Sequence, residues 1–277
     1  MVESELRELQ LAELNILKKV IEICKHYNLH YYALGGTLLG AIRHKGFIPW
    51  DDDIDIGLPR DDYEKLLIYL KQELQAPYQL HTVESGTGQY AYYFARVENS
   101  LIKVEKFFTI NKTVVPAWID IFPLDNVPDD DVEMKKWIAE CQKLKQVFTL
   151  SQASYVAASD SLQKKRSAPK AIARRIFLKL KLDRFINTKK AWLKLDTALK
   201  KYQNEKCNRL INFCGFWGIK ELFPKSIYEE TREYDFEDIK LVGPENFDYV
   251  LKQMYGDYMT PPPENKRDHH HIRILHS

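Results

Sequence analysis

The order of apolar and polar residues predicts helices along the whole chain. Over residues 3–28, apolar side chains recur every three or four positions, which is the spacing of a helix that buries one face. Similar spacing and helix-boundary residues predict further helices over about 37–44, 61–74, 130–150, 171–186, 189–205 and 244–256. In the last of these, Pro244 is expected to open the helix and Gly256 to cap its C-terminus.

Short apolar runs between turn residues predict the strands. They lie over residues 31–34, 50–57, 78–82, 90–98, 102–109, 114–122 and 209–216. Turns are predicted at 86–88 and at Asn99–Ser100, and Pro123 is predicted to end a strand. Strands mixed with helices in this order favour an α/β (α+β) fold with a mixed sheet. We expect a core over residues 1–130, and a helical region over 131–277 whose C-terminal block packs back on the core.

Carboxylates alternate with other residues in the predicted strand 50–57. Successive side chains of a strand point to opposite faces, so Asp51, Asp53 and Asp55 are expected to share one face. Three carboxylates on one face repel each other. We therefore expect a positive partner there, such as a divalent metal ion bound to phosphate.

A glycine pair precedes this acidic segment. The strand ending at residue 34 stops at Gly35 and Gly36, which allow backbone to approach a phosphate, and the helix from Thr37 offers free N–H groups. Asp120 is the one carboxylate in the apolar strand 114–122 and is predicted to be a third acid of the same site. The alternative is that backbone N–H groups satisfy Asp120. The aspartates at 129–131 are interpreted as helix-capping residues and not as metal ligands.

Composition and cysteine spacing bear on the cellular compartment. The chain has 277 residues and four cysteines, with no C-x-x-C spacing that would indicate a zinc site or disulfide framework. The N-terminal residues are charged and lack the pattern of a signal peptide, and no apolar run is long enough to span a membrane. The expected location is the cytoplasm.

The histidines at 269–271 are interpreted as structural or substrate-facing, with a structural role favoured.

Charge is distributed unevenly along the chain. Residues 161–201 contain fourteen Lys and Arg and two acidic residues, so this segment has a net charge of +12, while the whole chain has +2. Such asymmetry indicates an anionic partner. We favour an anionic membrane surface, which would make the protein peripheral at the inner face of the cell membrane, over a solvated helical subdomain. No nucleic-acid partner is expected.

Three stretches resemble a known family. The sequence LGGTLLGAIRHKGFIPWDDDIDIGLPRDDYEKL is similar to the LicD signature, and WIDIFPLDNVP and NFDYVLKQMYGDYMTPPP resemble its second and C-terminal blocks. The resemblance spans about residues 31–263. It implies a nucleotidyltransferase-like core in residues 1–130 and transfer of a phospho-alcohol from a CDP-alcohol carrier to a sugar hydroxyl. Fukutin-type proteins are relatives in this family.

The resemblance also implies roles for particular residues. Asp53, Asp55 and Asp120 match catalytic carboxylates that hold Mg²⁺ or Mn²⁺, and Asp51 is expected to join them as a metal ligand. The implied substrate-binding residues are Gly35, Gly36, Thr37, Arg43, His44 and Lys45. The last three are expected to face the diphosphate, with a solvated surface position as the alternative.

The implied reaction uses CDP-choline as first choice. Asp55 or Asp120 would accept the proton of a sugar hydroxyl on a lipid-linked glycan, such as a teichoic acid or lipopolysaccharide precursor, and CMP would leave. Aromatic rings would bind a quaternary ammonium, and Tyr90, Tyr92, Tyr93 and Tyr255 are examples of many candidates. The rival functions are a nucleotidyltransferase that releases pyrophosphate and a non-catalytic protein that binds membrane or RNA.

Overall fold

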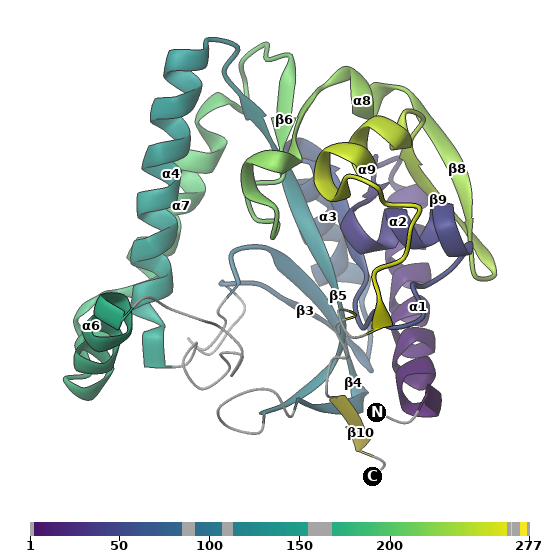
Figure 1. Ribbon diagram of the computed structural model, residues 1–277, viewed down its shortest axis with the longest axis horizontal. Helices are drawn as coiled ribbons and strands as arrows, with labels where there is room; N and C mark the ends of the chain where they lie inside the picture. Colours follow the sequence, from purple (N-terminus) through teal and green to yellow (C-terminus); the bar gives the residue numbers. More distant parts are fainter. Residues whose placement is uncertain are drawn as a thin grey trace.

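A mixed sheet with helices around it forms the centre of the molecule (Figure 1). The computed structural model describes residues 3–84, 92–106, 113–154, 168–264, 267 and 272–275. Strands and helices alternate in this part of the chain, and the sheet contains both parallel and antiparallel pairs. The predicted α/β class with a mixed sheet is therefore confirmed.

The central strands follow the order β1–β2–β5–β4–β10. Their bounds are β1 (Tyr32–Ala33), β2 (Asp55–Pro59), β5 (Thr113–Val127), β4 (Ala95–Lys106) and β10 (Ile272–Leu275). β2 and β5 are parallel, and the other neighbours in this row are antiparallel. Three short strands extend the sheet: β3 (Tyr78–His81) pairs with β4, β6 (Arg209–Ile211) pairs with β5, and β7 (Leu222–Pro224) pairs with β6.

Two long helices pack on this sheet. α1 (Glu3–His26) contacts β4, β5 and β10, and α3 (Arg60–Glu73) contacts β2 and β5. The apolar face of α1 is buried, as the spacing of apolar residues predicted; its fully buried side chains include Leu9, Leu17 and Val20. The N-terminal helix and the helix after Pro59 are therefore both confirmed.

The predicted strand 50–57 is wrong in its first half. β2 begins only at Asp55, and residues 50–54 form a loop. The backbone N–H of Asp51 donates to the carbonyl of Ile48, which closes a turn, and the side chain of Gln10 holds the carbonyl of Asp51. Because β1 has only two residues, it offers no backbone partner to this segment. Asp51 and Asp53 therefore do not share a strand face with Asp55.

The glycine pair lies inside a helix and not before it. α2 (Gly35–His44) begins two residues earlier than predicted, with Leu34 at its N-cap. Gly35 adopts a positive φ of 50°, which glycine tolerates without strain. The first turn of α2 is thus formed by two residues without side chains, next to the start of β2.

β4 and β5 are each longer than predicted. Residues 95–106 form one strand with a bulge between Asn99 and Lys103, because both sides of the bulge pair with β5; the predicted turn at Asn99–Ser100 is wrong. Pro123 does not end β5, which continues to Val127 because it pairs first with β2 and then with β6. The turn predicted at 86–88 and residues 107–109 of a predicted strand lie outside the described residues.

Three helices of the second half form an arm beside the sheet (Figure 1). They are α4 (Asp131–Ser151), α6 (Ala168–Lys179) and α7 (Thr188–Leu199). The side chain of Asp130 accepts from the N–H of Glu133, so the capping interpretation of these aspartates is confirmed for Asp130. α6 ends before the predicted helix 171–186 does, because Lys181 takes a left-handed conformation ahead of a 3₁₀ turn, Leu182–Phe185.

The C-terminal part contains a hairpin that the sequence pattern did not indicate. β8 (Thr231–Phe236) and β9 (Ile239–Pro244) are antiparallel. Four of the six residues of β8 are exposed, so it lacks the apolar alternation of a half-buried strand. α8 (Ser226–Glu229) precedes it. α9 (Phe247–Tyr255) follows, capped by Asn246 and not opened by Pro244, and it packs on α2. Gly256 caps its C-terminus as predicted.

Two further predictions concern the segment after β6 and the membrane. Only residues 209–211 of the predicted strand 209–216 pair in the sheet, and residues 212–217 form a turn. None of the helices described is both long and apolar enough to cross a membrane.

Candidate active site

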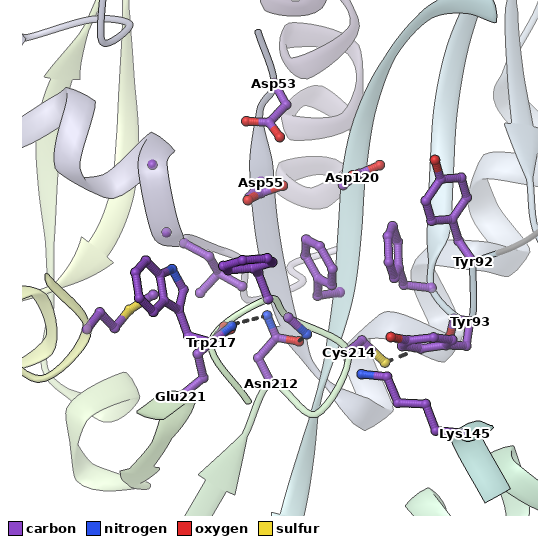
Figure 2. Close-up of a pocket in the computed structure, with 18 of the residues that line it drawn as sticks. Asp53, Asp55, Tyr92, Tyr93, Asp120, Lys145, Asn212, Cys214, Trp217 and Glu221 are labelled. Atoms are coloured by element: carbon purple, nitrogen blue, oxygen red, sulfur yellow. Dashed lines mark hydrogen bonds between the residues drawn. The ribbon is translucent and has the colours of Figure 1, made fainter. Parts of the chain in front are cut away.

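A pocket of about 570 Å³ opens where β2 and β5 meet the first turn of α2 (Figure 2). Gly35, Gly36 and three of the predicted catalytic carboxylates line it. The rest of its wall comes mainly from residues 92–94 before β4, from α4, from residues 212–221 and from the end of α9. The pocket thus joins elements from both halves of the chain.

Asp55 and Asp120 lie side by side in this pocket. They are direct partners in the register of the parallel strands β2 and β5, and parallel partners project to the same face of a sheet. Burial and the charges of Asp53 and Asp120 raise the pKa of Asp55 well above its usual range. The hydroxyl of Thr37 accepts from the N–H of Asp55 at 2.8 Å, so this predicted substrate residue positions Asp55 and does not line the pocket.

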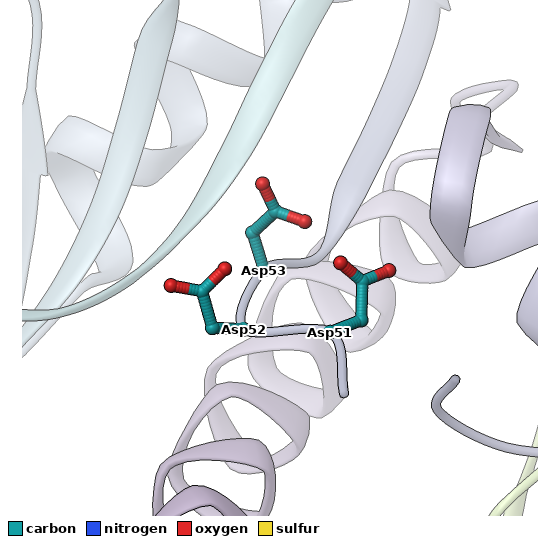
Figure 3. A group of neighbouring side chains, drawn as sticks. All are labelled: Asp51, Asp52 and Asp53. Atoms are coloured by element: carbon teal, nitrogen blue, oxygen red, sulfur yellow. The ribbon is translucent and has the colours of Figure 1, made fainter. Parts of the chain in front are cut away.

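The acidic loop before β2 gathers three carboxylates. One carboxylate oxygen from each of Asp51, Asp52 and Asp53 lies within 4.8 Å of the others (Figure 3). Burial, followed by the charges of Asp53 and Asp52, raises the pKa of Asp51. Of these three residues, only Asp53 also lines the pocket with Asp55. Asp52, the residue between Asp51 and Asp53 in the loop, is 4% exposed and belongs to this group.

The two glycines at the start of α2, Gly35 and Gly36, make room for Asp55 and Asp51. A Cβ atom at Gly36 would lie 2.5 Å from Oδ2 of Asp51, and one at Gly35 would lie 3.3 Å from Oδ2 of Asp55. Both side chains therefore point at the first turn of α2. Any larger residue at position 36 would displace Asp51.

Glu13 adds a further carboxylate that the sequence analysis missed. It lies on α1 and is fully buried, and neither of its oxygens has a hydrogen-bond partner among the residues that the structure describes. Burial, then the charges of Asp52 and Asp53, raise the pKa of Glu13 well above its usual value. A signal was present in the sequence, because Glu13 lies four residues from both Leu9 and Leu17 on the buried face of the helix.

These donors fit a divalent cation. Carboxylate oxygens are the ligands that Mg²⁺ and Mn²⁺ prefer. Asp51, Asp52 and Asp53 form a compact set, and the charges of Asp53 and Asp51 also act on Asp55. The orphaned carboxylate of Glu13 and the raised pKa values of Asp51 and Asp55 both indicate a shortage of positive charge. The residues present could therefore hold such an ion.

Asp120 has a positive partner within the chain. The Arg96 guanidinium donates to both of its oxygens, at 2.5 and 3.0 Å, and both side chains are buried. Arg96 also lies over the ring of Tyr92, with 3.7 Å from its guanidinium carbon to the ring centroid. From the sequence, the expected partner of Asp120 was either a metal ion or backbone N–H groups. An ion pair with an arginine was not predicted.

Arg43, His44 and Lys45 lie at the other end of α2 and are not among the residues that line the pocket. Arg43 donates to the carbonyl of Tyr258 at 2.6 Å, and Lys45 ends the helix in a left-handed conformation. A helix of this length places its two ends about 13 Å apart. The structure therefore brings together the glycines and the carboxylates, but not these three basic residues.

The far side of the pocket contains residues that the sequence analysis did not single out. Glu221, from the turn before β7, is buried, and burial raises its pKa to about 7. Lys145 of α4 lies 4.5 Å from the ring centroid of Tyr93, and burial lowers its pKa. Trp217 adds a ring (Figure 2).

Of the four tyrosines named as candidates for an ammonium site, Tyr92, Tyr93 and Tyr255 line the pocket. Tyr90 lies outside the described residues. Nothing in local spacing distinguished these tyrosines from the other aromatic residues of the chain. Only the fold brings them together.

Comparisons with known proteins identify one family, and one relative matches nearly the whole chain. The family described as "LicD/FKTN/FKRP, nucleotidyltransferase domain" matches residues 28–128. The chain is 31% identical over 271 residues to the lipopolysaccharide cholinephosphotransferase LicD of Haemophilus influenzae, covering 97% of this chain and 96% of that protein. It is 42% identical over 43 residues to the human ribitol 5-phosphate transferase FKRP, covering 16% of this chain and 9% of that protein. The chain therefore belongs to the LicD family and is an enzyme of its phosphotransferase class.

Proposed function

We propose that the protein transfers phosphocholine from CDP-choline to a sugar hydroxyl of a bacterial cell-surface glycan, such as a lipopolysaccharide or teichoic acid precursor, and releases CMP. The observation that carries this proposal is the pairing of Asp55 with Asp120 in a pocket next to the acidic loop. The full-length similarity to a cholinephosphotransferase supports choline as the alcohol. The core that holds these residues is proposed to be nucleotidyltransferase-like.

In this proposal, Asp53, Asp55 and Asp120 hold Mg²⁺ or Mn²⁺, with Asp51 as a further ligand. When bound, such an ion neutralises the diphosphate of the CDP-alcohol. The first turn of α2, at Gly35 and Gly36, lets backbone approach a phosphate oxygen. Lys145 of α4, which lies over the ring of Tyr93 in the pocket wall, supplies a second positive charge to the phosphates.

Proton transfer in the proposed reaction involves one of the paired carboxylates. The sugar hydroxyl oxygen forms a bond to the phosphorus that carries choline, the bond from that phosphorus to CMP breaks, and CMP leaves with the bonding electrons. The hydroxyl proton passes to Asp55 or Asp120. The Arg96 guanidinium already donates to both oxygens of Asp120, so Asp55 is the better acceptor.

Product analysis tests this proposal. The protein is incubated with CDP-choline, Mg²⁺ and a choline-free lipopolysaccharide or teichoic acid acceptor, and CMP and choline-labelled glycan are measured. We expect both products in equal amounts and their loss in Asp55→Asn, with Asp257→Asn, an exposed carboxylate outside the pocket, as the control. Pyrophosphate release from CTP without CMP release from any CDP-alcohol would instead identify a nucleotidyltransferase.

A second proposal concerns the basic segment 161–201. α6 and the 3₁₀ turn after it expose Ile172, Ile176, Leu180 and Phe185, whose exposed fractions range from 53% to 85%. Basic residues lie between these apolar side chains in the sequence, at Arg174, Arg175, Lys179, Lys181 and Arg184. Apolar side chains among basic residues suit an anionic membrane surface, where each basic residue contributes about 1 kcal/mol. We propose that this segment brings the enzyme to the inner face of the membrane, where a lipid-linked acceptor is located.

Vesicle flotation tests the membrane proposal. The full-length protein is mixed with anionic or neutral vesicles at low and high salt. We expect flotation only with anionic vesicles at low salt, and its loss in the double variant Ile176→Ser, Phe185→Ser. Val132→Ser, which removes an apolar side chain of similar exposure at the start of α4, is the matched control. No flotation at low salt would rule the proposal out.

A further inference from the structure

The two ends of the pocket differ in how their carboxylates are compensated. Asp120, near the acidic loop, has Arg96 as its ion-pair partner. Glu221, on the far wall, is 5% exposed, and its two oxygens accept from the backbone N–H of Trp217 at 3.0 Å and the side-chain amide of Asn212 at 2.7 Å. Both donors are neutral. Within the described part of the chain, no ion pair to Glu221 is found.

A buried carboxylate without a positive partner is costly. Burial disfavours its charged form and raises its pKa. The two neutral hydrogen bonds, and to a smaller extent the charge of Lys145, which forms no ion pair with Glu221, lower the pKa again but offset only part of this cost. Glu221 nevertheless lines the pocket and not the hydrophobic core. A ligand that brings a positive charge to this position would compensate the carboxylate. Each oxygen already accepts a hydrogen bond, so that charge need not come with an N–H donor.

Two aromatic rings lie beside Glu221. Trp217 donates to Glu221 through its backbone, and its ring meets that of Tyr255 edge-on, with 5.1 Å between centroids and an interplanar angle of 77°. Lys220 lies 5.1 Å from the centroid of Trp217 and is held by the carbonyl of Met254. The ring of Trp217 therefore already has a cation of the chain beside it. Among the described residues, no cation lies over the ring of Tyr255.

The other tyrosine rings of the pocket already have cations of the chain beside them. Arg96 lies 3.7 Å from the centroid of Tyr92, and Lys145 lies 4.5 Å from that of Tyr93. Arg96 is already paired with Asp120, so Lys145 beside Tyr93 is the cation of this wall that suits phosphate. The wall with Glu221 and Tyr255 has negative charge and an aromatic face, which suit a cation.

We propose that Glu221, Trp217 and Tyr255 bind the trimethylammonium group of choline, so that Glu221 selects a cationic alcohol over a neutral polyol. The proposal rests on the proposed phosphocholine transfer in the same pocket and adds the residues that recognise the alcohol. A quaternary ammonium cannot donate a hydrogen bond from nitrogen, so charge and ring faces are its means of recognition. A neutral polyol would leave the charge of Glu221 uncompensated.

Calorimetric titration of the full-length protein with Mg²⁺ tests this assignment. The ligands are CDP-choline, CDP-glycerol and the CDP-ester of 3,3-dimethylbutanol, which has the shape of CDP-choline but no charge on its alcohol. For the wild-type protein, we expect the neutral ester to bind about tenfold more weakly than CDP-choline or worse. This comparison needs no variant, so it does not depend on the folding of a mutant.

Variants then identify the residues responsible. Glu221→Gln is expected to weaken CDP-choline about tenfold while changing CDP-glycerol by less than about threefold. Trp217→Leu should shift the same ratio in the same direction. Glu229→Gln, an exposed carboxylate outside the pocket, is the matched control and should leave both affinities unchanged. A thermal melt of each variant shows that it is folded.

Each outcome separates this inference from the function on which it rests. If the wild-type protein binds CDP-choline and its neutral ester equally, or if Glu221→Gln weakens CDP-choline and CDP-glycerol equally, the cation site is wrong while phospho-alcohol transfer stands. If the wild-type protein binds neither CDP-choline nor CMP, the proposed function fails, and the cation site fails with it.

Discussion

The guanidinium of Arg96 holds both carboxylate oxygens of Asp120, at 2.5 and 3.0 Å, directly beside Asp55. One of the two paired carboxylates of the pocket is therefore compensated by the chain itself. Asp55 is left with Asp53 and Asp120 as like charges, and its raised pKa follows from burial and from these neighbours. The two aspartates are adjacent in the sheet but differ in their electrostatic surroundings.

Removal of this positive charge is expected to destabilise the metal-free protein. Arg96→Met removes the guanidinium that donates to both oxygens of the buried Asp120, and loss of one partner of a buried ion pair typically lowers the free energy of unfolding by about 3–5 kcal/mol. Urea unfolding with and without Mg²⁺ measures the effect. Because a cation can replace the lost charge, Mg²⁺ should stabilise the variant more than the wild type. Equal stability of the two metal-free proteins would contradict the structural role of this ion pair.

Asp55→Asn should separate stability from activity. It removes a charge from a site where burial and like charges oppose ionisation, so the metal-free protein should melt at a higher temperature than the wild type. Activity should fall about a hundredfold or more, because metal and proton handling are both lost. Melting curves and CMP release in the same buffer check both parts. A variant less stable than the wild type at neutral pH would show that the charge of Asp55 is already compensated.

Gly36→Ala should reduce activity through Asp51. The added Cβ would lie 2.5 Å from Oδ2 of Asp51, so this carboxylate has to move. We expect loss of transfer activity with little loss of stability, because alanine is favoured over glycine within a helix. The control is the same substitution in an Asp51→Ala background, where the clash is absent. If Gly36→Ala reduces activity by the same factor there, the effect does not act through Asp51.

The ion pair of Arg60 with Asp125, outside the acidic loop, allows a test of how burial changes the contribution of an ion pair to stability. Arg60 donates to both oxygens of Asp125, at 2.7 and 2.9 Å, and both side chains are almost fully buried. Arg60→Met should lower the free energy of unfolding by about 3–5 kcal/mol. Arg209→Met breaks the exposed pair of Arg209 with Asp131 and should cost less than about 1 kcal/mol. Chemical denaturation of the two variants gives the comparison, and similar costs would argue against burial as the cause.

The affinity for CDP-choline should depend on pH through Glu221. Its pKa is raised to about 7 in the folded protein, mainly by burial. Between pH 6 and pH 8 the carboxylate ionises, so affinity for a cationic alcohol should rise roughly tenfold. The pH dependence of folding stability has the opposite sign. Protonation of Glu221 contributes to the stability of the folded protein. This contribution is fully present below the unfolded pKa of about 4.5 and is lost as pH rises through about 7.

Titrations at three pH values check this prediction. Glu221→Gln should show no such rise for CDP-choline, and CDP-glycerol should show none with the wild-type protein. A rise of the same size in Glu221→Gln would assign the pH dependence to another group.

Local patterns in the sequence were sufficient for the long helices and for part of the site. Apolar spacing predicted α1, α4 and α9 because each buries one face, and a helix repeats that face every three or four residues. The glycine pair and Asp55 were found because phosphate and metal chemistry need these residue types close together in the chain. Asp120 was found because a carboxylate inside an apolar strand needs a partner.

Tertiary structure alone decided the partners and the pocket. Arg96 meets Asp120 because β4 pairs with β5, and Glu13 lies near the acidic loop because α1 packs on the sheet. Glu221 and Lys145 reach the pocket from segments more than 70 residues apart in the chain. No local spacing encodes such contacts, since they depend on how the sheet and helices pack. The sequence determined which residues could do the chemistry, and the fold determined which charges meet there.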